Sequence, residues 1–126
     1  MIDHVSLQVR DLQASAVFYD RVLEPLGYNR LVERETSVAF GKRYPELWLN
    51  ARPAGSPAAP DTGAHLCLRA RNEEAVRAFH AAAVAAGGSD DGAPGPRAAA
   101  MTTYFGAFVR DLDGNRIEAA CFPSTE

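Results

Sequence analysis

The chain has 126 residues, about the size of one domain, and is long enough to bury a real hydrophobic core. Its formal net charge is -3 and its basic residues are scattered, which argues against a nucleic-acid or anionic-membrane partner. The N-terminus does not resemble a signal peptide and no stretch approaches the length of a membrane span. We therefore expect a cytoplasmic protein with a small-molecule partner.

The first part of the chain predicts a strand, a helix and three further strands. Apolar and polar residues alternate over residues 2–10, as in a strand with one face on a core. Asp11 can cap the helix that follows, because its carboxylate can accept a backbone N–H. Short strands separated by turns are expected over 28–33, 37–41 and 46–51.

The same order of elements follows a Pro-, Ala- and Gly-rich linker at residues 52–62. A strand is expected over 64–70, and Asn72 can cap a second helix that ends near Gly87 and Gly88. Residues 89–100 predict only a short edge strand. Asp113 and Gly114 favour a hairpin turn, so we predict its two strands over 104–110 and 116–122. The two cysteines, Cys67 and Cys121, lack CxxC spacing and are expected to be reduced core or near-core residues.

An internal repeat accounts for this order. A constant offset of 61 residues places HVSLQVRDLQASAVFYDRVLEPLGY over HLCLRARNEEAVRAFHAAAVAAGGS without a gap. The offset superposes His4 on His65, each at the start of a predicted strand. We predict one domain over 1–126, built from a first module at about 1–51 and a second at about 63–126.

His4, His65 and Glu118 are the candidate metal ligands. Strand alternation places the two histidines on the face turned away from the helices, and Glu118 is the only acidic residue within the last predicted strand. A single strand histidine is more often a hydrogen-bonded structural residue, but two in equivalent places favour a pair. Two imidazoles and a carboxylate bind Fe(II), Mn(II), Ni(II), Co(II) or Zn(II).

These residues resemble a known family. The paired modules, IDHVSLQVRDLQASAVFYDRVL at the start and DLDGNRIEAA at the end, are similar to the vicinal oxygen chelate superfamily of glyoxalase I, bleomycin-resistance proteins and extradiol dioxygenases. The resemblance covers nearly the whole chain. It implies an α+β, glyoxalase-like fold in which two tandem βαβββ modules form a curved mixed sheet around a cavity.

The resemblance also implies a ligand set. The family's metal positions fall on His4 in the first strand, His65 in the fifth and Glu118 in the eighth. The fourth position, a glutamate in glyoxalase I, falls on Trp48, with Glu46 the nearest carboxylate on that face. Trp48 could instead line a pocket for an apolar ligand or belong to the core.

Extradiol dioxygenases share the triad of two histidines and one carboxylate but carry two more residues, and this sequence departs from both. Their tyrosine position is Phe108, and residues 99–101 hold no histidine. Tyr104 could donate a proton to a bound oxyanion or be a structural strand residue. Arg69, on the face of His65, could hold a carboxylate or be an ordinary exposed strand arginine.

We therefore expect a metal-dependent enzyme that chelates two oxygens of a small substrate and stabilises an enolate or oxyanion. Catalysis is assigned to Glu118 and Tyr104, and substrate binding to Trp48 and Arg69. The alternatives are a small-molecule binding protein of the bleomycin-resistance type, without catalysis, and a member that retains only the scaffold. The family also implies a homodimer, whose site forms within one chain or across two.

Overall fold

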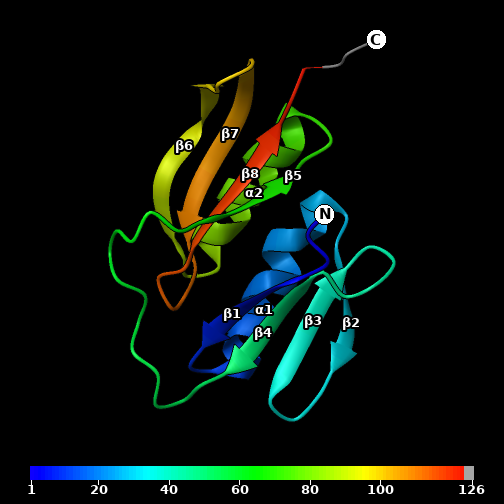
Figure 1. The fold of residues 1–126 in the computed structure, drawn as a ribbon, viewed down its shortest axis with the longest axis vertical. Helices are drawn as coiled ribbons and strands as arrows, with labels where there is room; N and C mark the ends of the chain where they lie inside the picture. Colours follow the sequence, from blue (N-terminus) through cyan, green and yellow to red (C-terminus); the bar gives the residue numbers. More distant parts are fainter. Residues whose placement is uncertain (124–126) are drawn as a thin grey trace.

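The computed structural model describes residues 1–123 and places them in two four-stranded mixed sheets with a layer of two helices (Figure 1). The first half contains β1 (Val5–Val9), α1 (Leu12–Leu23), the 3-10 turn η1 (Glu24–Leu26), β2 (Asn29–Glu33), β3 (Ser37–Gly41) and β4 (Leu47–Ala51). The second contains β5 (Leu66–Arg69), α2 (Glu73–Ala85), β6 (Ser89–Ala98), β7 (Thr103–Arg110) and β8 (Arg116–Cys121). The predicted α+β fold with two repeated modules is confirmed.

The two sheets have the same topology. Their strand orders are β1-β4-β3-β2 and β5-β8-β7-β6, so each module pairs its first strand with its last. This pairing is parallel in both sheets, and the other pairings are antiparallel. Ser6 lies opposite Trp48 in the first sheet as Cys67 lies opposite Glu118 in the second. The backbone therefore preserves the internal repeat.

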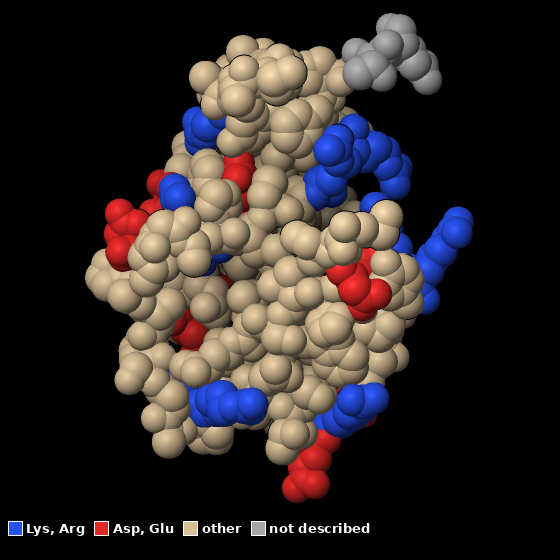
Figure 2. Space-filling model, viewed as in Figure 1, with Lys and Arg blue, Asp and Glu red and all other residues tan. Residues whose placement is uncertain are grey.

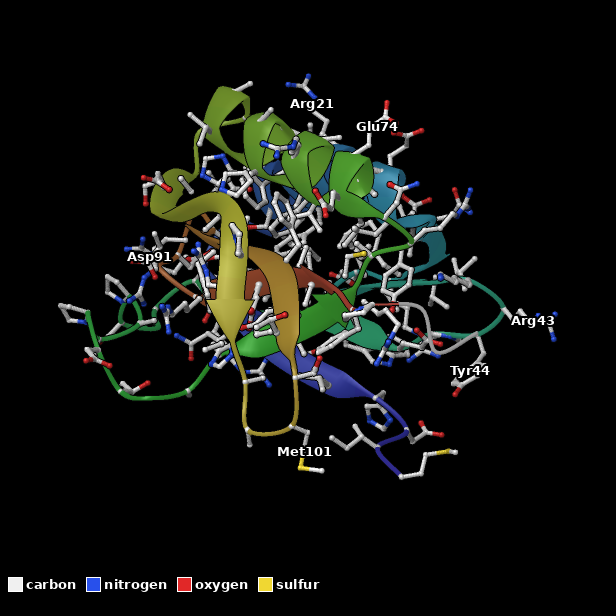
Figure 3. All side chains as sticks on the ribbon, turned by 90° about the horizontal axis from the view of Figure 1, so that it is seen from above. Arg21, Arg43, Tyr44, Glu74, Asp91 and Met101 are labelled. Atoms are coloured by element: carbon white, nitrogen blue, oxygen red, sulfur yellow. The ribbon has the colours of Figure 1, made fainter. Side chains whose placement is uncertain are left out.

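Both helices lie on the same side of the sheets and contact each other (Figures 1 and 3). The predicted caps form, because Asp11 accepts the backbone N–H of Ala14 at 3.1 Å and Asn72 accepts that of Ala75 at 2.9 Å. The core between helices and sheets is apolar, and it includes the fully buried residues Phe18, Tyr19, Phe40, Phe79 and Ile117. The opposite faces of the sheets are left for the polar residues.

A buried polar turn joins the two modules. Asp111 accepts the hydroxyl of Tyr19 on α1 at 2.6 Å, although Asp111 itself follows β7. Asp113 accepts both the backbone N–H and the Nε of Arg10, each at 3.0 Å. Asn115 donates to the carbonyl of Gln8 on β1 at 3.1 Å. The turn between β7 and β8 is thereby fixed against the end of β1.

Two strand predictions need correction. The first strand begins at Val5 rather than at residue 2, and the fifth begins at Leu66, so His4 and His65 both precede the hydrogen-bonded ladders. β6 is a ten-residue strand rather than a short one. Its pairing with β7 shifts register around Gly92 and Gly95, and these bulges allow a Gly- and Pro-rich segment to remain in the sheet. No helix among residues 1–123 is long and apolar enough to cross a membrane.

Candidate functional site

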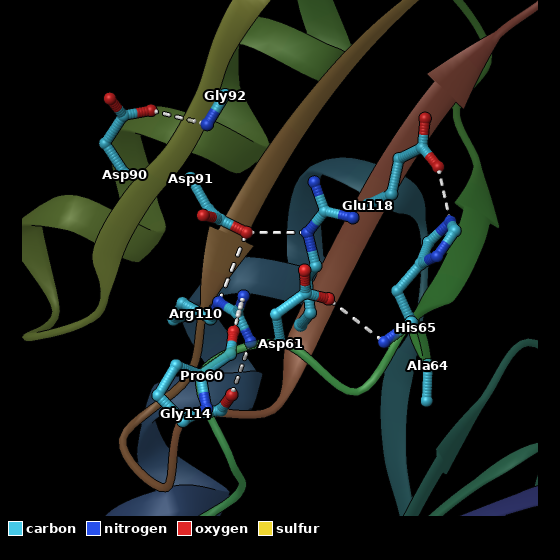
Figure 4. A network of polar contacts seen from close by, with 12 residues as sticks. Pro60, Asp61, Ala64, His65, Asp90, Asp91, Gly92, Arg110, Gly114 and Glu118 are labelled. Atoms are coloured by element: carbon cyan, nitrogen blue, oxygen red, sulfur yellow. Dashed lines mark hydrogen bonds and ion pairs between the residues drawn. The ribbon is translucent and has the colours of Figure 1, made fainter.

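The candidate site is centred on a buried carboxylate. Glu118 on β8 is only 3% exposed and faces away from the helices, between Cys67 on β5 and Phe108 on β7. Its Oε2 accepts the hydroxyl of Tyr104 at 2.6 Å, and its Oε1 lies 3.0 Å from Nε2 of His65 (Figure 4). The structure therefore brings together three of the residues that the sequence singles out.

Strand alternation explains how these side chains meet. His65 and Cys67 are two residues apart at the start of β5, so both project on the face of Glu118. Tyr104 and Gly106 share that face on β7. A Cβ atom on Gly106 would lie 2.8 Å from the Tyr104 ring and 3.1 Å from Oε2 of Glu118. Glycine therefore leaves the space in which the two groups bond.

The site holds its hydroxyl and its thiol in the protonated form. The hydrogen bond to Glu118, together with burial, raises the pKa of Tyr104 to about 12. Burial is the main cause that raises the pKa of Cys67 to about 12, and the Glu118 carboxylate adds to it. Solvent reaches Cys67, but neighbouring atoms still partly desolvate its thiol. At neutral pH Tyr104 is a donor, and Cys67 is not a thiolate nucleophile.

A cavity of about 450 Å³ opens beside His65 and Cys67. It lies where the edge strands β1 and β5 approach each other, and residues of the linker cover part of it. The lining is mainly apolar, and its basic side chains are His65, Arg110 and Arg116. The His65 ring packs edge-on against Phe108, with centroids 5.5 Å apart. Such a cavity is typical of a small-molecule site.

His4 lies apart from this cluster. Its Nδ1 bonds Asp3 at 2.7 Å, and its side chain is 52% exposed. With Glu46 it lines an adjoining cavity of about 330 Å³, which shares residues of β1 and β5 with the cavity beside His65. Within residues 1–123, no three His, Cys, Asp or Glu side chains are grouped so that they could hold a metal ion. One chain thus brings together two of the three predicted metal ligands.

Trp48 and Arg69 also lie outside the cavity beside His65. Trp48 is partly buried on the open face of the first sheet, where the Arg34 guanidinium lies 5.1 Å from its ring centroid. Arg69 lies 4.7 Å from the ring centroid of Phe122, at the far end of β5. Their expected roles in substrate binding therefore gain no support from the cavity.

The spacing of His65 and Glu118 fits two ligands of one metal ion. Two ligands at right angles, each about 2.1 Å from a metal, lie about 3 Å apart, as Nε2 of His65 and Oε1 of Glu118 do. A nitrogen and a carboxylate oxygen also form a donor set that suits a divalent transition metal. The pair fits two adjacent coordination positions, and further ligands must come from substrate, water or a second copy of the chain.

One residue of the site lies elsewhere than its sequence predicts, and another carries no clear signal in the sequence. Cys67 is exposed beside Glu118 rather than in the core, as its spacing of two from His65 indicates in retrospect. Cys121 is partly buried and packs against the core, as expected. Arg116 was not singled out, although it precedes Glu118 by two residues on the same strand face. Its ion-pair partner Asp91 comes from β6, whose length the sequence does not define.

A family model and two solved structures similar to this chain carry the same family description. A model described as the Glyoxalase/Bleomycin resistance protein/Dioxygenase superfamily matches residues 1–119. The chain is 33% identical to a glyoxalase/bleomycin resistance protein from Albidiferax ferrireducens T118, over 95% of this chain and 98% of that one, with a TM-score of 0.85. A glyoxalase/bleomycin resistance protein/dioxygenase family enzyme from Burkholderia phytofirmans PsJN is 18% identical over 95% and 97%, with a TM-score of 0.73, and shows the shared fold alone. No protein of curated function matches.

Proposed function

Because the chain belongs to the Glyoxalase/Bleomycin resistance protein/Dioxygenase superfamily, we propose that it is a metal-dependent enzyme acting on a small molecule beside Glu118. The observation that carries the proposal is the pair formed by His65 and Glu118, whose donor atoms are 3.0 Å apart at the edge of a cavity. These two residues would hold the metal. When bound, the cation would polarise substrate oxygens as a Lewis acid.

His4 is the third ligand in this proposal, and it requires a second copy of the chain. Within one chain His4 and His65 line adjoining cavities and are not grouped with a third ligand among residues 1–123, so in this proposal a homodimer brings the His4 of one copy to the site of another. The half-exposed His4 side chain is accessible for such a contact.

Glu118 and Tyr104 contribute acid–base chemistry. The buried Glu118 carboxylate is held by two donors, and it can take a proton from a substrate carbon or hydroxyl next to His65. Tyr104 keeps its proton at neutral pH and steadies the Glu118 carboxylate through the 2.6 Å bond. The linker residues that line part of the cavity would limit the access of water.

A second candidate is a binding protein without catalysis. It is favoured by the mainly apolar lining of the cavity and by the two-donor set of a single chain. In that case the ligand binds with equal affinity in the presence and absence of a metal chelator.

Metal reloading distinguishes the two functions. The protein is reloaded separately with Fe(II), Mn(II), Ni(II), Co(II) and Zn(II), and the bound metal is measured by elemental analysis after gel filtration. We expect one tightly held ion per site in the wild type and its loss in His65→Ala and Glu118→Gln. His80→Ala is the matched control, since His80 bonds Asp90 away from the site. Wild-type loading no higher than that of His65→Ala would reject the metal-dependent function.

A further inference from the structure

The cavity beside His65 is lined by positively charged side chains, although the chain as a whole is acidic. The chain carries 16 acidic and 13 basic residues, yet the side chains that line this cavity include Arg110 and Arg116 and, within residues 1–123, no aspartate or glutamate. On the molecular face drawn in Figure 2, by contrast, acidic and basic side chains are interspersed. The cavity therefore differs from the surface around it in attracting anions.

One carboxylate is shared by both arginines. Oδ2 of Asp91 lies 3.2 Å from Nε of Arg110 and 2.6 Å from Nε of Arg116. These three side chains together carry one net positive charge, and the Glu118 carboxylate at the edge of the cavity is bonded by His65 and Tyr104. This is a suitable balance for a ligand that carries a single negative charge, whereas a phosphate monoester with about two would remain incompletely neutralised.

The two arginines are engaged differently. Arg110 uses its terminal nitrogens to donate to the carbonyls of Gly114 and Pro60, so it fastens the linker to the turn between β7 and β8 (Figure 4). Arg116 donates only its Nε, and within residues 1–123 no acceptor bonds its two terminal nitrogens. Its guanidinium lies 4.1 Å from the centroid of Phe108, and Asp91 holds it at Nε. The free edge of Arg116 is a preorganised fork for two oxygens.

The rest of the cavity suits an apolar body. Val5 and Leu7 from β1 and Leu66 from β5 line it, together with alanines of the linker. His65 lies on the same wall as Arg116, because Leu66 pairs with Ile117 and the preceding residues are neighbours across the two strands. A ligand anchored at Arg116 would therefore place its adjacent carbons near His65 and Glu118.

We propose that this cavity binds a small carboxylic acid, with its carboxylate on the terminal nitrogens of Arg116 and its apolar portion against Val5, Leu7 and Leu66. The inference rests on the proposed function in that it names the class of substrate for the same site. It does not depend on the metal, because Arg116 is not one of the expected ligands.

Matched ligand pairs test this assignment. Binding of hexanoate and hexanamide, and of 3-phenylpropanoate and 3-phenylpropanamide, is measured by ligand-observed NMR in the presence of EDTA, so that a metal cannot hold the carboxylate. We expect at least one carboxylate to bind the wild type at least tenfold more tightly than its amide. Arg116→Gln should abolish this preference, and Arg116→Lys should restore part of it, since a lysine keeps the charge but not the fork.

Arg21→Gln is the control, because it removes the same charge from an exposed position on α1 (Figure 3). Circular dichroism verifies that each variant is folded. Equal binding of acid and amide in both pairs would overturn the proposal, as would an undiminished preference in folded Arg116→Gln. Tighter binding of hexyl phosphate than of hexanoate would overturn the choice of a carboxylate. Metal loading is measured separately. If the wild type binds no metal, the metal-dependent function is rejected, but the preference for a carboxylate over its amide still stands.

Discussion

Glu118 depends on its neighbours for its buried state. A buried carboxylate that loses a hydrogen-bond donor retains its desolvation cost without compensation. Tyr104 and His65 both bond it, from a neighbouring strand and from the residue before β5. Removing either partner therefore loses one hydrogen bond and also leaves part of the desolvation cost of the Glu118 carboxylate uncompensated.

We predict that Tyr104→Phe lowers the free energy of unfolding by about 1 kcal/mol at pH 7, because Oε2 of Glu118 loses its donor. A group whose pKa is raised on folding contributes stability that is lost as the pH rises through its folded value, so the wild type should lose this advantage between pH 10 and about 12. Urea denaturation of both proteins measures the difference. An equal gap between the two proteins at pH 8 and pH 12 would contradict the role assigned to this hydroxyl.

Asp111 gives a second prediction, with acid pH as the variable. Burial raises the pKa of Asp111 despite its bonds from Tyr19 and Asn115. The protonated carboxyl is therefore favoured in the folded state, and its contribution is present below the unfolded pKa of about 3.9 and lost as the pH rises through the folded value. We expect the stability of the wild type relative to Asp111→Asn to fall as the pH rises above about 4.

Unfolding free energies of the two proteins between pH 4 and pH 7 measure this slope. The amide side chain introduced by Asp111→Asn does not titrate, so the difference between the proteins isolates the carboxyl group. A difference that grows with pH would mean that the bonds to Asp111 outweigh its burial.

At the scale of the strand, Gly106 on β7 leaves the space in which Tyr104 and Glu118 form their hydrogen bond. We predict that Gly106→Ala destabilises the protein by about 1–3 kcal/mol, because the added methyl meets the Tyr104 ring and Glu118 at less than contact distance. Gly95→Ala is the matched control, since Gly95 pairs with Gly106 but its Cβ would meet only ordinary contacts at 3.7 Å and beyond. Denaturation curves should show a change within about 0.5 kcal/mol for the control.

Equal losses in Gly106→Ala and Gly95→Ala would contradict a specific steric role at Gly106. They would indicate instead that a methyl group anywhere along the β6–β7 pair disturbs the ladder.

Strand alternation also shows what the sequence could and could not predict. The period of two placed Glu118 and His65 on one face, and the structure brings them into contact. A strand was expected at β6, but its length was underestimated because SDDGAPGPRA has little strand propensity and its course depends on pairing with β7. Arg116 was missed for the same reason, because its partner Asp91 lies on that strand.

The packing of the two modules explains why the position of His4 relative to His65 could not be predicted from the sequence. The repeat assigned equivalent local positions to His4 and His65, but their separation depends on how the two modules pack. The packing rests on helix contacts and on the buried turn around Asp111 and Asp113, neither of which follows from strand periodicity. Fold and local faces were therefore predictable, whereas the assembled ligand set was not.

Oligomeric state is the prediction that belongs to this scale. β2 and β6 are sheet edges, and the N-terminal Met1 and Ile2 are exposed. Unpaired edges and exposed apolar side chains favour association, so we expect a homodimer at micromolar concentration. Light scattering coupled to gel filtration measures the mass, and metal loading of His4→Ala determines whether association completes the site. A monomeric mass with full metal loading would exclude a ligand from a second copy.

The repeated topology also allows the molecule to be compared with itself. Trp48 lies opposite Ser6 as Glu118 lies opposite Cys67, so equivalent backbone positions hold an indole in one half and a carboxylate in the other. After a gene segment has doubled, selection need preserve an ancestral residue in only one copy, and the other is free to drift or to acquire a different use. The first sheet therefore repeats the topology of the second with an indole at the position that the Glu118 carboxylate fills.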